Sequence, residues 1–187
     1  SHNIAIGYEA LDATGANDQV GTIAIGYAAL GALTSGGSNV AVGYLALTGH
    51  TTGGANVALG HGALKGTAGA TASTSSNNIA IGSNALGGDW NDGTASNYNI
   101  AIGGESQDGV LNGAIGNVSM GFQSLGALTS GDGNTAVGHS AGTTFSTQSQ
   151  NTVIGYQAAQ SSQAGNITAL GYKALEDCTA DGTVGIG

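Results

Sequence analysis

A five-residue phrase, Asn-Ile-Ala-Ile-Gly with close variants, recurs along the whole chain and constrains the fold more than any other feature. It occurs first at residues 3–7 and returns as Asn-Val-Ala-Leu-Gly at 56–60 and Asn-Thr-Ala-Val-Gly at 134–138. Its closing glycines are spaced 16 to 22 residues apart. They are Gly7, Gly26, Gly43, Gly60, Gly82, Gly103, Gly121, Gly138, Gly155, Gly171 and Gly187. Such a persistent period indicates a repeat architecture.

Each phrase predicts a short β-strand of about five residues, because large aliphatic residues alternate with Ala and turn-forming residues flank them. The alternation places two aliphatic side chains on one face and Ala on the other. The residues after each glycine, such as Tyr44-Leu45-Ala46-Leu47, predict a second short extended piece. A loop rich in Gly, Ser, Thr and Asn then follows.

A repeat of this length predicts an all-β fold, a parallel β-solenoid of about eleven coils stacked about 4.8 Å apart. The recurrent glycines exclude a helical array, and a propeller blade needs a longer repeat. No change in composition marks a boundary, so residues 1–187 form a single repeat domain. Because the chain opens within one repeat and ends on the glycine of another, we expect it to be a piece of a longer fibre protein.

One such coil encloses little volume, and a thin roll buries only a small fraction of its surface. The chain contains more aliphatic positions than this interior accepts. We therefore expect one face of the solenoid to pack against copies of itself in a homotrimer. Whether residues such as Ile4 and Ile6 face the interior or the three-fold axis is left open at this point.

The charge balance excludes several classes of partner. The chain has eleven acidic residues and two lysines, for a net charge of −9. Nucleic acids and anionic membrane surfaces need many cations on the protein, so neither is an expected partner. No apolar run has the length of a membrane span, so we expect no membrane insertion in this segment. The single cysteine, Cys178, excludes an intrachain disulfide.

The phrases at residues 39–47, 134–138 and 151–158 resemble the head repeats of trimeric autotransporter adhesins and the related repeats of bacteriophage tail fibres. The resemblance covers nearly the whole chain. It implies a trimeric left-handed parallel β-roll with an attachment role. Adhesin heads have shorter repeats, whereas these repeats carry Tyr and Leu after the glycine, which favours the tail-fibre type.

An aromatic residue or His follows most of the repeat glycines. The favoured interpretation is a stack of rings that seals adjacent coils, and the alternative is an aromatic binding ladder. His61 and His139 occupy this position, where three-fold symmetry would make one His into three metal ligands, although packing is the simpler account. His50 lies in a loop and is expected to be solvated.

The loop at 89–93 is the most distinctive one. Asp89, Trp90, Asn91 and Asp92 form a candidate surface-recognition loop in which an exposed Trp90 stacks on a sugar. The oxygen ligands here also make Ca²⁺ a weak candidate, and no other cofactor is expected. Turn chemistry alone also explains Asp, Asn and Gly at these positions. The sparse acids Glu105, Asp108, Glu176, Asp177 and Asp181 are expected to be solvated.

No catalytic constellation is evident, so the chain is not expected to be an enzyme. The sequence predicts a non-enzymatic structural and attachment segment of a phage tail fibre that binds a glycan or protein receptor on a host surface. The location would be extracellular, on a virion or a bacterial surface. The alternatives are the head of a bacterial trimeric adhesin, a secreted ligand-binding solenoid with a flat Thr-rich face, and a glycan depolymerase.

Overall fold

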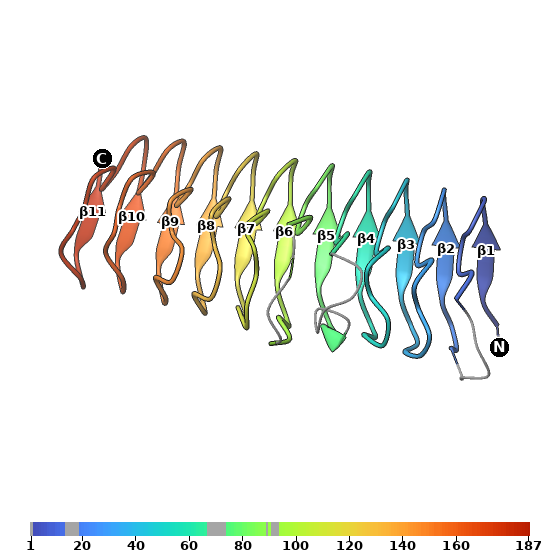
Figure 1. Cartoon of the computed structure of the whole chain (residues 1–187). Coiled ribbons are helices and arrows are strands. Elements are labelled where there is room, and N and C mark those ends of the chain that lie inside the picture. Colours follow the sequence, from blue (N-terminus) through green and yellow to red (C-terminus); the bar gives the residue numbers. More distant parts are fainter. Residues whose placement is uncertain (1, 14–18, 67–73, 89, 91–93) are drawn as a thin grey trace.

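The chain folds into a straight rod of stacked coils (Figure 1). The structure, a computed structural model, describes residues 2–13, 19–66, 74–88, 90 and 94–187. The N-terminus and C-terminus lie at opposite ends of the rod. Eleven strands in this part form one sheet, in sequence order, with about ten turns of the solenoid between them. The all-β solenoid predicted from the repeat is confirmed.

Each strand is the centre of one repeat phrase, and it is three residues long rather than about five. Coil n is defined here as strand βn with the residues up to the next strand. The strands are β1 (Ile4–Ile6), β2 (Ile23–Ile25), β3 (Val40–Val42), β4 (Val57–Leu59), β5 (Ile79–Ile81), β6 (Ile100–Ile102), β7 (Val118–Met120), β8 (Thr135–Val137), β9 (Thr152–Ile154), β10 (Thr168–Leu170) and β11 (Val184–Ile186).

The strands pair in parallel and in register, so that equivalent residues of neighbouring coils lie side by side. Ala41 in β3, for example, is paired with Ala24 on one side and Ala58 on the other. The middle residue of every strand from β2 to β10 is buried, whereas β1 and β11 are open sheet edges. The sheet therefore turns its Ala side inward.

The first and third residues of the strands point outward and form the apolar strand face. From β1 to β11 this face consists of Ile, Val, Leu and Met, with Thr135, Thr152 and Thr168 beginning β8 to β10. Most of these side chains are partly exposed in the single chain. The question of where the larger aliphatic residues face is thus answered: they face away from the interior.

The residues after each glycine form a turn layer that closes the coil over the Ala side of the sheet. Leu47 and the equivalent Leu30, Leu64, Leu86 and Leu125 are fully buried and share one core cluster with the strand alanines. The expected second extended piece is wrong, because Leu45 (φ +56°) and Leu47 (φ +54°) are left-handed. Gly62 and Gly142 occupy equivalent positions with similar φ angles of +62° and +58°.

Hydrogen bonds in the turn layer also run from coil to coil. The N–H of Leu30 donates to the carbonyl of Ala46 at 3.0 Å, and the N–H of Leu47 donates to the carbonyl of Ala63 at 3.0 Å. The alternating left-handed residues let the backbone direct its polar groups along the rod. This pairing satisfies the buried backbone of a layer that has no strand.

A ladder of buried asparagines runs along the start of the strands. From Asn39 to Asn134, each Oδ1 accepts from the backbone N–H and from the Nδ2 of the next asparagine. Oδ1 of Asn117, for example, accepts from the N–H of Asn134 at 2.9 Å and from its Nδ2 at 3.0 Å. Each Nδ2 also donates to a loop carbonyl, as Asn117 does to Gly131 at 2.8 Å. The ladder members are Asn39, Asn56, Asn78, Asn99, Asn117, Asn134 and Asn151. This ladder fixes both coil spacing and loop path.

Candidate functional site

Rings follow the repeat glycines and stack along one border of the sheet in two rows. Neighbouring ring centroids are 5.1 to 5.7 Å apart. The first row is Tyr8, Tyr27, Tyr44 and His61, and the second is Phe122, His139, Tyr156 and Tyr172. The stack that seals adjacent coils is confirmed, and a ligand-binding role for the rows stays a prediction.

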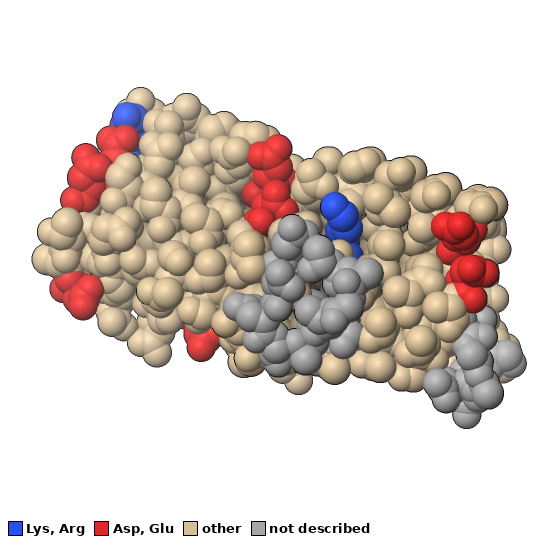
Figure 2. Space-filling view, viewed as in Figure 1, with Lys and Arg blue, Asp and Glu red and all other residues tan. Residues whose placement is uncertain are grey.

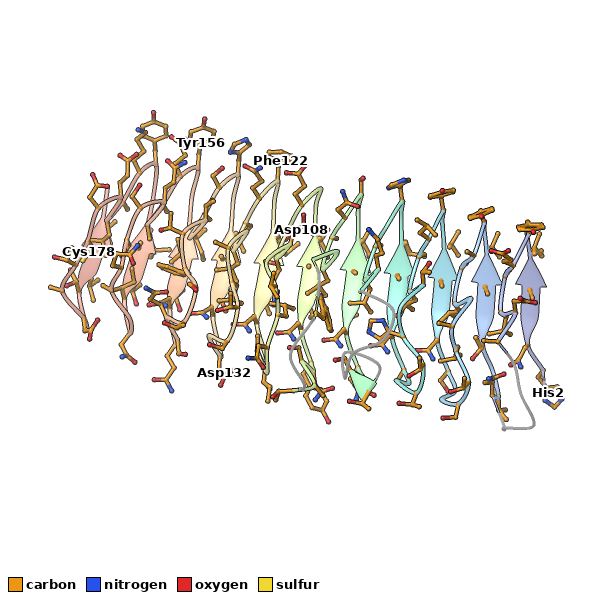
Figure 3. All side chains as sticks on the ribbon, viewed as in Figure 1. His2, Asp108, Phe122, Asp132, Tyr156 and Cys178 are labelled. Atoms are coloured by element: carbon orange, nitrogen blue, oxygen red, sulfur yellow. The ribbon has the colours of Figure 1, made fainter. Side chains whose placement is uncertain are left out.

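The two rows are separated by coils 5 and 6, where the ring position holds Ser83 and Gly104 (Figure 3). Phe122 therefore has a ring neighbour, His139, on one side and Gly104 on the other. A Cβ at Gly104 would lie 3.5 Å from Cδ2 of Phe122, which shows how near that ring lies to the empty position. Phe122 is 44% exposed. The interruption leaves the face of the Phe122 ring toward coil 6 without a ring neighbour.

A shallow hollow of about 260 Å³ adjoins this break on the turn layer. It is lined by Glu105, Asp108, Gln123, Gly126, Ala127 and Thr143. Oε2 of Glu105 accepts from Nε2 of Gln123 at 2.8 Å, and Oγ1 of Thr143 donates to the carbonyl of Gln123 at 3.0 Å. Figure 2 shows acidic side chains gathered at mid-length of the rod on this face. The acids of coil 6 are thus half-buried rather than fully solvated.

A buried polar cluster lies under this part of the rod, where the other coils have Ala and Leu. Oγ of Ser106 donates to Oγ of Ser119 at 2.8 Å, and Ser124 donates to the carbonyl of Ala136 at 3.0 Å. Gln107 is also fully buried. The sequence signal was the replacement of Tyr-x-Ala-Leu by Gly-Glu-Ser-Gln at 104–107. The departures from the repeat are therefore concentrated in coils 5 to 7.

Trp90 corrects the prediction of an exposed sugar-stacking residue. Its side chain is only 1% exposed and meets the His50 ring edge-on, with centroids 5.4 Å apart. The indole is held in the core because its large apolar surface fills a coil interior otherwise built from Ala and Leu. Asp89, Asn91 and Asp92 lie outside the described residues, so the remainder of that candidate loop stays a prediction.

His50 is also buried, which overturns the expectation of a solvated loop residue. Neither of its ring nitrogens has a hydrogen-bond partner among the described residues. Burial lowers the pKa of His50 from 6.5 to about 4, because an apolar environment disfavours the imidazolium. The side chain therefore belongs to the core as a neutral ring.

This burial predicts acid sensitivity. The unfolded chain binds a proton at His50 below its ordinary pKa of 6.5, whereas the folded chain does so only below about 4. The stabilising effect is complete above pH 6.5 and decreases as the pH falls toward about 4, by about 1.4 kcal/mol per pH unit. Urea unfolding of wild type and His50→Leu, compared across this range, isolates the contribution. Identical pH dependence of the two proteins would contradict it.

The structure brings no metal ligands together in the part that it describes. No group of three His, Cys, Asp or Glu side chains there is arranged to hold an ion. His61 stacks on Tyr44, and His139 stacks on Tyr156 while its Nδ1 lies 2.9 Å from Oγ of Ser140. Glu176 is paired with Lys173 at 2.9 Å, and Asp181 accepts from the N–H of Gly165 at 2.8 Å.

Comparison of the chain with family models, with curated proteins and with solved structures finds no match. Among the described residues no helix has the length and apolar character to cross a bilayer.

Proposed function

We propose that this chain is a non-enzymatic structural and attachment segment of a trimeric phage tail fibre, located outside the cell on the virion. The observation that carries the proposal is the apolar strand face. In the single chain it leaves two aliphatic or Thr side chains per strand partly exposed over eleven consecutive strands. Contiguous apolar surface of this extent marks an interface.

A cyclic trimer would bury this face along the whole length of each chain. Each of three parallel rods would turn its apolar strand face toward a common axis, so that every repeat meets its own copies at the same level. The turn layer, which carries the polar side chains of the hollow, would then face outward. Such a rod has the rigidity and length expected of a fibre that holds a recognition surface away from its anchor.

The second candidate is the head of a bacterial trimeric adhesin, which would use the same assembly. The segments beside this chain discriminate between the two, since an adhesin has a coiled-coil stalk and a membrane anchor. A secreted solenoid with a flat Thr-rich face is supported less well, because Thr occupies the apolar strand face only at Thr135, Thr152 and Thr168. Loss of polysaccharide viscosity would reveal a depolymerase instead.

Attachment is tested by the binding of the fluorescently labelled protein to a panel of bacterial cells and to matrix-coated surfaces. We expect saturable binding that depends on assembly, since three linked sites bind more tightly than one. In Ile102→Glu a charge is placed on the apolar strand face at a partly exposed position, so we expect a folded chain that no longer assembles. Cell binding of this variant should weaken by about 100-fold.

Gln157→Glu is the matched control, because it adds the same charge at a left-handed turn-layer position away from the strand face. Circular dichroism verifies that both variants keep the fold. Equal cell binding by Ile102→Glu and wild type would contradict the role of the apolar strand face. Failure of wild type to bind any cell or surface would contradict the attachment function itself.

A further inference from the structure

We propose that the break in the aromatic rows and the hollow beside it form a binding site for a neutral sugar ring. Phe122 supplies the stacking face, and Glu105 and Gln123 supply the hydroxyl partners. This inference rests on the attachment function proposed above and names the chemical class of its receptor. It moves the recognition site from the loop at 89–92 to coils 6 and 7.

The face of the Phe122 ring toward coil 6 is not covered by another ring. Within each row, a neighbouring ring at 5.1 to 5.7 Å occupies the space that a ligand ring would need. At Gly104 this space holds no side chain, and Phe122 lies directly beside it. The C–H face of a pyranose is apolar and about as thick as one missing ring. A sugar ring can therefore continue the row from Phe122 toward coil 6.

The adjoining hollow carries side chains that can hydrogen-bond to hydroxyl groups. Glu105 follows Gly104 and Gln123 follows Phe122 along the chain, so the polar groups begin where the ring face ends. Their mutual hydrogen bond of 2.8 Å holds both side chains in place and uses only one proton of the Gln123 amide. The carboxylate retains acceptor sites, and the amide retains a second donor. A sugar hydroxyl, which both donates and accepts, matches this pair.

The negative charge of the hollow and of the whole chain favours a neutral ligand. Glu105 and Asp108 both line the hollow, and the chain carries a net charge of −9. A sialylated or otherwise anionic sugar would be repelled by both the local and the overall charge. The class of ligand is therefore a neutral glycan.

The hollow would remain accessible to a ligand in the proposed trimer. The hollow lies on the turn layer, whereas the strand alanines and the turn-layer leucines fill the space between that layer and the sheet. The apolar strand face is on the other side of the sheet. Assembly through the apolar strand face leaves the hollow open to solvent, once in each of the three chains.

The test is a substitution that completes the aromatic row. Gly104 does not have a positive φ, and a Cβ there would make an ordinary contact of 3.5 Å, so Gly104→Tyr is compatible with the fold. The new ring should extend the row from Phe122 and occupy the sugar position. His139→Tyr is the matched control, because it introduces the same residue at the same repeat position but on the side of Phe122 that faces away from Gly104.

Binding is measured by calorimetry with maltose, cellobiose, lactose and chitobiose as neutral probes, and with sialyllactose as the anionic probe. We expect wild type to bind at least one neutral probe with a Kd of about 1 mM or tighter and to reject sialyllactose. Gly104→Tyr should lose at least about tenfold in affinity while its melting temperature stays equal or rises. Glu105→Gln should also weaken binding, and His139→Tyr should bind as wild type does.

Unchanged affinity in Gly104→Tyr, or preference for sialyllactose, would overturn the proposed site. A wild-type protein that adheres to cells but binds none of the neutral probes would overturn it as well, and would leave the attachment function standing. A protein that binds the probes but adheres to no cell would support the sugar site and contradict the attachment function.

Discussion

Replacing Gly121 by Ala should prevent the chain from folding into a complete rod. Gly121 has φ +132°, and a Cβ there would lie 2.5 Å from the carbonyl oxygen of Gly138 in the next coil. Both coils would have to move apart, although the N–H of Gly138 is bonded to the carbonyl of Met120 at 2.7 Å. Because the backbone itself is in the way, we expect a destabilisation of about 4 kcal/mol or more.

Thermal unfolding followed by circular dichroism measures this effect. Gly165→Ala is the matched control, since Gly165 has no positive φ and its nearest atom would be 3.7 Å from the new Cβ. It should change the melting temperature little. If Gly121→Ala melts as wild type does, then the glycine ladder does not set the distance between coils, and the parallel register described here is wrong.

Replacing Asn117 by Leu should have the second largest effect. The side chain is fully buried and links three coils, since it bonds Asn99 at 3.0 Å and accepts from the N–H and Nδ2 of Asn134. Leu has a similar size but offers no polar group. The carbonyl of Gly131 and two donors of Asn134 would lose this partner in the interior. We expect a loss of about 3 kcal/mol or more.

Urea unfolding measures the loss, and Asn112→Leu is the control because Asn112 is half-buried and lies outside the ladder. The ladder position holds a residue other than Asn only near the ends of the described rod, at Thr22, Ile167 and Thr183. A stability of Asn117→Leu equal to that of Asn112→Leu would show that the asparagines mark strand starts without holding the coils together.

The architecture could be predicted from the sequence because one local rule is repeated. Alternation of Ile and Ala across a strand such as Ile100–Ile102 gives the strand one face of small side chains and one of large side chains. Fixed glycines every 16 to 22 residues then place equivalent strands side by side. Parallel register and stacked rings follow from that rule, whereas the direction in which the Ala face points was decided only by the structure.

The path of the backbone between strands could not be predicted in the same way. Leu45 and Leu47 adopt left-handed angles that leucine disfavours, so propensity predicts an extended piece there. The conformation is imposed by the bonds to neighbouring coils, as in the N–H of Leu45 donating to the carbonyl of Tyr27 at 2.9 Å. The glycine at Gly62, one repeat later, was the available signal.

The candidate site was predicted only in outline. Sequence analysis singled out the loop at 89–93 and placed recognition on Trp90, which the fold buries against His50. A lone Trp among polar residues does not indicate by itself whether its side chain is buried. The hollow at Glu105 and Gln123 depends on side chains from successive coils, and it becomes visible only when the register of those coils is known.

We propose that three chains bury the apolar strand face together, and the molar mass in solution tests this claim. Light scattering coupled to size exclusion, on a preparation shown to be folded by circular dichroism, should give three times the chain mass of 17.9 kDa. The mass should stay constant on dilution through the micromolar range. A folded species with the mass of one chain would contradict the claim, and would show that the apolar strand face is exposed in the working protein.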